Sequence, residues 1–193
     1  MKKIFKAHSC IVAFSIVFVA SAAHGWGLAV HKMATDRAVR LLPTQLQDFY
    51  WANREVLQEL SIEADLRKDW DRTEGPKHYI DLEHYAADRL PRLVDQAVRE
   101  LGMEKLSKSG WVPWNTQLVY ALLVEAMRAR DYPAILRLSG DISHYVADAH
   151  IPLHATENYD GWLTGDTGVH ARFESRLVEQ FPEVQVFDPH PAS

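Results

Sequence analysis

The sequence is poor in several features that would place it in other classes of protein. Cys10 is the only cysteine among 193 residues, so a disulfide framework is excluded. Nine glycines and nine prolines are too few for a collagen-like or low-complexity chain, and 47% of the residues are hydrophobic. The 26 acidic residues outnumber the 21 basic ones, so no overall positive charge favours binding to nucleic acid. What remains is a globular domain of ordinary composition.

Long apolar runs are also scarce, apart from one near the N-terminus. Three lysines within the first six residues precede the apolar stretch from Ile11 to Ala20, and small residues follow it. This pattern is typical of a secretory signal peptide, and the stretch is shorter than the roughly 20 residues of a membrane span. We therefore expect residues 1–25 to be a signal peptide that is cleaved before Trp26, with an uncleaved anchor as the alternative. The mature protein is then secreted or periplasmic.

Strand signals are weak, because no segment alternates between apolar and polar residues over a sustained length. Apolar residues recur instead at helical spacing, which predicts helices over residues 30–42, 44–60, 82–101, 116–128, 134–150 and 168–181. The third of these is expected to be interrupted or bent near Pro91. Loops are expected at 69–76, 107–113 and 155–167, and a loosely ordered tail at 182–193. No repeat or linker divides the chain. The predicted fold is therefore all-α, a single-domain helical bundle over residues 26–181.

Histidines and carboxylates carry the most specific chemical signal. His144 and Asp148 are four residues apart, as are His170 and Glu174, and such pairs share one face of a helix. His154 follows a proline that ends the preceding helix, which frees its imidazole from the helical register. Imidazole and carboxylate are the usual ligands of a hydrolytic zinc ion, which keeps one position open for water. One such pair alone is more often a surface or packing contact, but two pairs with a histidine between them favour a metal site.

Further candidates lie upstream of these pairs. Asp65 belongs to a short polar stretch, His78 begins the segment His-Tyr-Ile-Asp, and His31 follows the expected N-terminus by five residues. The free α-amino group and the carbonyl of Trp26 could chelate a metal together, with His31 one helical turn away. The alternative for His31 is a plain histidine on a helix surface.

The order of these residues along the chain resembles that of the zinc-dependent phospholipase C and single-strand-specific nuclease superfamily. The matching elements are Trp26-Gly27…His31, Ala64-Asp65, His78-Tyr79, His144-x-x-x-Asp148 with Pro-Leu-His154, and His170-x-x-x-Glu174. The resemblance implies an all-helical domain with three zinc ions and a general base at Asp65. It implies one zinc on Asp65, His78, His144 and Asp148, a second on Trp26, His31 and the bridging Asp148, and a third on His154, His170 and Glu174.

The two branches of the superfamily differ near the last ligands. The nuclease branch has a glycine-asparagine stretch where this chain has residues 165–169, and the closing Glu174 is similar to the phospholipase branch. The short spacing from Trp26 to His31 is instead similar to the nuclease branch. We expect a phospholipase C-like enzyme that cleaves phospholipids at a membrane surface into diacylglycerol and phosphorylated headgroup, with no stable protein partner indicated.

Two alternatives stay open. The first is a zinc-dependent single-strand-specific nuclease or 3′-nucleotidase, with nucleic acid as the substrate. The second is a non-catalytic, metal-stabilised binding module, which is disfavoured because structural zinc sites are normally closed by four protein ligands. Aromatic residues suit either substrate, since they stack bases or surround a choline ammonium. The candidates for such a cleft are Tyr79, Trp111, Trp114, Tyr159 and Trp162, each with a core or loop anchor as the alternative.

Overall fold

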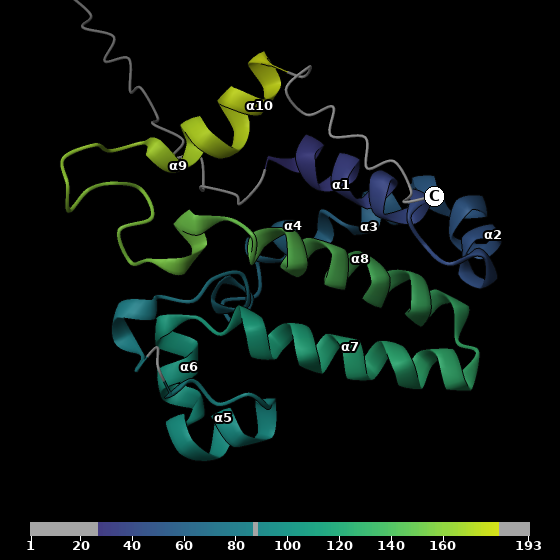
Figure 1. Ribbon diagram of the computed structural model, residues 1–193, viewed down its shortest axis with the longest axis horizontal. Coiled ribbons are helices and arrows are strands. Elements are labelled where there is room, and N and C mark those ends of the chain that lie inside the picture. The colour runs from purple at the N-terminus through teal and green to yellow at the C-terminus, as the bar shows by residue number, and fades with distance from the viewer. Residues whose placement is uncertain (1–26, 87–88, 182–193) are drawn as a thin grey trace, which may run out of the picture.

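A computed structural model describes residues 27–86 and 89–181, so the predicted signal peptide, Trp26 and the predicted tail lie outside the described residues. Within these ranges the chain is helical and has no strand, which confirms the predicted all-α fold. Two long antiparallel helices, α7 (Val112–Ala129) and α8 (Tyr132–Asp148), run side by side through the molecule (Figure 1). None of the described helices is both long and apolar enough to cross a bilayer.

Shorter elements surround this pair (Figure 1). Those that precede α7 in the chain are α1 (Leu28–Arg40), α2 (Thr44–Ala52), α3 (Arg54–Leu60), α4 (Glu63–Arg67), η1 (Gly75–Lys77), η2 (Leu82–His84), α5 (Val94–Leu101) and α6 (Met103–Ser109). Those that follow α8 are η4 (Pro152–Ala155), α9 (Val169–Ala171), the π-helical turn η5 (Arg172–Arg176) and α10 (Leu177–Gln180). Helices α1 and α3 pack against α8, whereas α5 and α6 lie near the start of α7.

The boundaries of α8 follow from local chemistry. The side chain of Asp131 caps its N-terminus by accepting a hydrogen bond of 3.1 Å from the amide of Ala134. Pro133 lies in the first turn, where its missing N–H removes no intrahelical hydrogen bond. The helix ends at Asp148, before Pro152, as the sequence predicts. The capped start and the proline-limited end fix the register that places His144 and Asp148 in the last turns.

The apolar core consists of two adjoining clusters. One lies between α1, α2, α3, α7 and α8 and contains Val39, Tyr50, Leu57, Leu123, Ala126 and Ile135. The other surrounds the start of α7 and contains Ala64, Ile80, Tyr85, Ala97, Leu106, Trp111, Val112, Trp114, Val119 and Tyr145. Leu138 and Ile142 of α8 pack against both clusters. Helix α8 therefore joins the core to the side chains that it carries at its C-terminal end.

The helix predicted over residues 82–101 is interrupted around Pro91, as the sequence predicts, but the described residues before Pro91 do not form an α-helix. Among the described residues there, η2, Arg89 and, from Val94 onward, α5 are helical, and the chain between η2 and α5 includes Pro91. The carbonyl of Pro91 accepts a hydrogen bond of 2.8 Å from Trp114 Nε1, so this segment is held across α7 instead of within a helix. The sequence also misses α6, which begins after Gly102 and ends before Gly110, both at positive φ (78° and 76°).

Close packing of α8 against the end of α3 leads to a prediction on stability. A Cβ added at Gly140 would lie 2.8 Å from the backbone carbon of Leu60, too close for this junction to accept without moving the helices apart. Gly140→Ala is expected to destabilise the protein by about 1–3 kcal/mol, the usual cost of overpacking. Urea denaturation checks this, with Gly75→Ala as the control because an added Cβ there meets nothing within 4 Å. Equal unfolding midpoints for the two variants would contradict the prediction.

Candidate metal centre

Helix α8 supplies two of the candidate ligands from adjacent turns. His144 Nε2 lies 3.2 Å from Asp148 Oδ2. His31 reaches the same point from α1, with its Nε2 3.4 Å from Asp148 Oδ1 and its ring stacked on that of His144 at 3.9 Å between centroids. All three side chains are buried, and their ligand atoms are close enough together to hold one metal ion.

A second group adjoins the first and draws on α4 and on the residue after η1. His78 Nδ1 lies 2.8 Å from Asp148 Oδ2 and 3.0 Å from His144 Nε2. Asp65 Oδ1 lies 3.6 Å from that nitrogen of His144 and 3.8 Å from His78 Nδ1. Asp65, His78 and His144 therefore form a second group that could hold a metal ion. Since the two oxygens of Asp148 face different groups, this carboxylate is placed to bridge two ions.

The third group brings η4, α9 and η5 together. His170 Nε2 lies 2.7 Å from Glu174 Oε1 and 3.1 Å from His154 Nε2. His154 Nε2 in turn lies 3.3 Å from Glu174 Oε1, and all three side chains are buried. These residues form the third possible metal group. His154 also links it to the other two, because its Nδ1 lies 3.9 Å from Asp148 Oδ1.

Backbone carbonyls fix the orientation of two of the imidazoles. His144 Nδ1 donates to the carbonyl of Ser61 at 2.8 Å, and His154 Nδ1 donates to the carbonyl of His78 at the same distance. Each bond leaves the opposite nitrogen, Nε2, facing the other candidate ligands. Such outer hydrogen bonds select the tautomer that binds a metal and hold the ring in place.

Several buried polar atoms of the site lack the hydrogen-bond partners that buried groups normally have. Both ring nitrogens of His31 and Oδ1 of Asp148 are buried without a hydrogen-bond partner among the described residues. Burial lowers the pKa of His31, which favours the neutral imidazole that binds metals. Burial alone would raise the pKa of Asp148, but its contacts with His144, His31 and His78 hold that pKa well below its ordinary value. A cation held by nitrogen and oxygen donors satisfies these groups, and zinc fits that donor set.

A pocket opens directly beside the candidate ligands. It has a volume of about 390 Å³, and its lining includes Lys68, His78, Tyr79, Asp81, His154, Glu157, Tyr159, Trp162 and His170. Lys68 Nζ lies 2.6 Å from Asp65 Oδ1, so a positive charge adjoins the second group at the pocket wall. Burial raises the pKa of Asp81 to about 6. The pocket thus offers a cation, aromatic rings and carboxylates next to His78 of the second group and His154 and His170 of the third.

Behind His78 lies a charged cluster that the sequence analysis did not identify. Glu74 is fully buried, and its Oε1 lies 3.5 Å from Nε2 of His78, on the opposite side of the ring from Asp148. The hydroxyl of Tyr145 donates to Glu74 Oε1, and Arg67 lies 3.3 Å from the same atom. Lys77 Nζ lies 2.7 Å from Oε2. The spacing of four residues between Glu74 and His78 could have indicated this contact, but the two residues flank η1 and share no predicted helix.

The structure brings together eight of the predicted ligands: His31, Asp65, His78, His144, Asp148, His154, His170 and Glu174. Trp26, the ninth, lies outside the described residues. The amide of Gly27, the first described residue, donates to the carbonyl of Glu174 at 3.2 Å. Of the aromatic candidates, Tyr79, Tyr159 and Trp162 line the pocket, whereas Trp111 and Trp114 are buried in the core.

Comparison with known proteins identifies the family. The family model for zinc-dependent phospholipase C matches residues 30–184, a span that contains all eight of these residues. No match to the chain was found among curated proteins or among solved structures. The family match covers most of the chain and agrees with the helical fold and the three ligand groups. The chain therefore belongs to the zinc-dependent phospholipase C family.

Proposed function

We propose that the protein is a phospholipase C-like hydrolase that cleaves the phosphodiester of a phospholipid to diacylglycerol and a phosphorylated headgroup. The observation that carries the proposal is the convergence of three buried ligand groups beside one pocket that is lined by a lysine and aromatic rings. We propose that the three groups hold three zinc ions and that cleavage before Trp26 supplies the last ligands. We also propose that the signal sequence exports the protein to the periplasm or beyond.

The residues of the site have separate roles in the proposed reaction. When bound, zinc lowers the pKa of a water molecule and polarises phosphate oxygens. Asp148 joins the first two groups and fixes the spacing between them. Lys68 faces the pocket and is placed to bind a phosphate oxygen by a charge-assisted hydrogen bond. His154 and His170 line the same pocket, and Glu174 lies 2.7 Å from His170; we propose that this third group stabilises the departing alcohol oxygen.

The role of Asp65 as general base stays a prediction. Burial alone would raise the pKa of its carboxyl, but His144 and Lys68 lower it below the ordinary value. A lowered pKa makes a carboxylate a weaker base and keeps it ionised as a ligand. The electrostatics of the site therefore support the ligand role of Asp65 better than the role of base.

The experiment that tests the proposed function compares two substrates in one preparation. Zinc-loaded protein, produced as the full chain and purified after export, is assayed for headgroup release from phosphatidylcholine and for cleavage of single-stranded DNA. Mass spectrometry of the same sample checks that the chain begins at Trp26. Headgroup release without DNA cleavage is the expected result. DNA cleavage with intact lipid would instead establish the nuclease, and fully loaded protein inactive on both would favour the binding module.

Lys68 leads to a further prediction on activity. Lys68→Met is expected to lower kcat/KM for phosphatidylcholine by about 10- to 150-fold, because a hydrogen bond to a charged oxygen contributes about 1.5–3 kcal/mol. Lys32→Met is the matched control, since Lys32 also pairs with a carboxylate, Glu59 at 2.6 Å, but does not line the pocket. Zinc content is measured for both variants. Unchanged kcat/KM in Lys68→Met with full zinc would contradict the assignment.

A further inference from the structure

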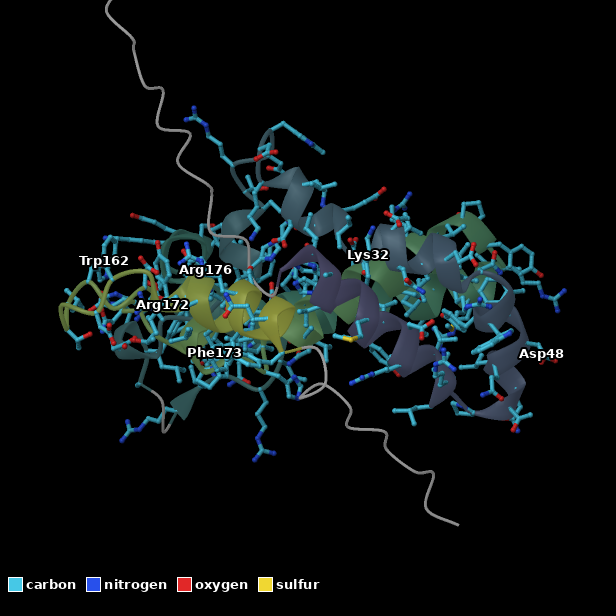
Figure 2. The ribbon with its side chains drawn as sticks, turned by 90° about the horizontal axis from the view of Figure 1, so that it is seen from above. Lys32, Asp48, Trp162, Arg172, Phe173 and Arg176 are labelled. Atoms are coloured by element: carbon cyan, nitrogen blue, oxygen red, sulfur yellow. The ribbon has the colours of Figure 1, made fainter. Side chains whose placement is uncertain are left out.

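The loop between η4 and α9 exposes two large apolar side chains next to each other. Trp162 is 58% exposed and Leu163 is 68% exposed. Figure 2 places Trp162 at one end of the molecule, far from Asp48 of α2 at the other end. Isolated apolar residues are common on protein surfaces, but an adjacent pair at the edge of a pocket is a feature of interaction sites.

The loop is held in one shape by its own hydrogen bonds. The amide of Leu163 donates to Asn158 Oδ1 at 2.8 Å, and Trp162 Nε1 donates to the carbonyl of Glu157 at 3.3 Å. Gly161 has φ +79°, and a Cβ at this position would lie 2.4 Å from the carbonyl oxygen of Asp166. The exposed pair is therefore presented by a preformed turn, which reduces the entropy that binding would cost.

The pair adjoins the pocket of the metal centre. Trp162 and Tyr159 line that pocket together with His154 and His170, and the rings of Trp162 and Tyr159 lie 5.7 Å apart. Leu163 follows Trp162 but does not belong to the pocket lining. A surface that covered the pair would consequently meet the protein at the mouth of the pocket.

The charge of the loop selects among possible partners. Residues 155–168 contain Glu157, Asp160 and Asp166 and no lysine or arginine. Arg172 of η5 pairs with Asp166 at 3.1 Å. Glu157 and Asp160 still leave the loop with a net negative charge, which would repel a nucleic-acid strand or a strongly anionic membrane. A tryptophan and a leucine side by side instead suit the boundary between headgroups and acyl chains, where the indole keeps its polar edge in the headgroup layer.

We propose that residues 157–168 dock the protein on a zwitterionic phospholipid surface, with Trp162 and Leu163 inserted at the headgroup boundary. The inference rests on the proposed function, because it states how the pocket meets a substrate that lies in a membrane. It assigns to the loop a role in binding the bilayer that is separate from the chemistry of the ligand groups.

The test uses zinc-loaded protein and vesicles of pure phosphatidylcholine. Vesicle binding is measured by co-sedimentation for the wild type, for Leu163→Asp and for the control Leu41→Asp. Leu41 is also largely exposed, at 54%, but follows α1 toward the end of the molecule that carries α2. Leu163→Asp is expected to bind vesicles about tenfold more weakly, because it loses apolar transfer energy and adds a charge that must approach lipid. Leu41→Asp should bind like the wild type.

Activity on two forms of the lipid separates docking from chemistry. Leu163→Asp should lose more hydrolysis of vesicles than of dispersed short-chain phosphatidylcholine. Wild-type binding by Leu163→Asp, or preference of the wild type for anionic vesicles, would overturn the docking proposal even if lipid is hydrolysed. Vesicle binding that depends on Leu163, in a wild type that hydrolyses neither form of the lipid, would support docking while refuting the proposed function.

Discussion

Replacing Asp148 by asparagine is expected to lower hydrolytic activity by more than about 100-fold and to reduce the zinc content of the purified protein, since even outer partners of metal ligands are worth 10–100-fold. Its Oδ1 lies 3.4 Å from His31 Nε2, and its Oδ2 lies 2.8 Å from His78 Nδ1. No other side chain in the described part of the chain faces the ligands of the first two groups with separate oxygens. The amide keeps the shape of the carboxylate but removes its charge and one acceptor oxygen.

The zinc content per chain is measured after dialysis by elemental mass spectrometry. Headgroup release is measured on the same protein. The matched control is Asp95→Asn, because Asp95 is an exposed carboxylate that pairs with Arg99 at 2.7 Å on α5. Circular dichroism shows whether Asp148→Asn keeps its helical content. A folded Asp148→Asn protein with full zinc and wild-type turnover would show that this carboxylate does not join the two groups.

The site could be predicted where helical geometry or a proline decides the placement of a side chain. His144 with Asp148, and His170 with Glu174, are four residues apart, so an α-helix through them would align each pair. In the structure the second pair spans α9 and the π-helical turn η5 and still meets at 2.7 Å. The turn after α8 that brings His154 to His170 follows from Pro152. The meeting of α1 with the end of α8, which joins His31 to Asp148, is a tertiary contact that local spacing does not determine. The family resemblance, rather than periodicity, indicated that contact.

The errors have physical reasons of the same kind. The apolar spacing from Leu82 to Leu101 fits a helix that is interrupted near Pro91, but the described residues before Pro91 do not form an α-helix. The hydrogen bond from Trp114 to the carbonyl of Pro91 holds this segment in a non-helical path. Asn53 divides the predicted helix 44–60 into α2 and α3. The first case shows a tertiary contact overriding a local preference. At Asn53 the contact is local, because its side-chain amide donates to the carbonyl of Phe49 at 2.8 Å. The charged cluster around Glu74 was missed because its members come from three places in the chain: α4, the turn around η1, and α8.

The cluster behind His78 leads to the second large effect. Glu74→Gln is expected to weaken zinc binding at the second group by about 10–100-fold, the usual cost of removing an outer carboxylate from a metal-binding histidine. Burial alone would raise the pKa of Glu74, but His78, Lys77 and Tyr145 together lower it below its ordinary value, so the group is an anion. That anion lies 3.5 Å from Nε2 of His78, whose other nitrogen, Nδ1, lies 2.8 Å from Asp148. Glu74 is therefore a positioning residue that acts through His78.

Loss of folding would not explain this result, because both cations of the cluster keep other stabilising contacts. Arg67 also pairs with Asp141 at 2.7 Å, and Lys77 is partly exposed to water. Zinc affinity is measured by chelator competition, and the visible spectrum of the cobalt-substituted protein reports the geometry of the site. Glu63→Gln is the control, because Glu63 is an exposed carboxylate on α4.

A double-mutant cycle separates positioning from a general effect on stability. If Glu74 acts through the ring of His78, Glu74→Gln should weaken zinc binding in the wild type but add little in a His78→Ala background. A purely structural role would make the two substitutions additive and would leave the cobalt spectrum of Glu74→Gln unchanged. The expected non-additivity would show that the metal centre includes more than its ligands. It would also include the side chains behind His78 that hold this ligand, namely Glu74, Arg67, Lys77 and Tyr145.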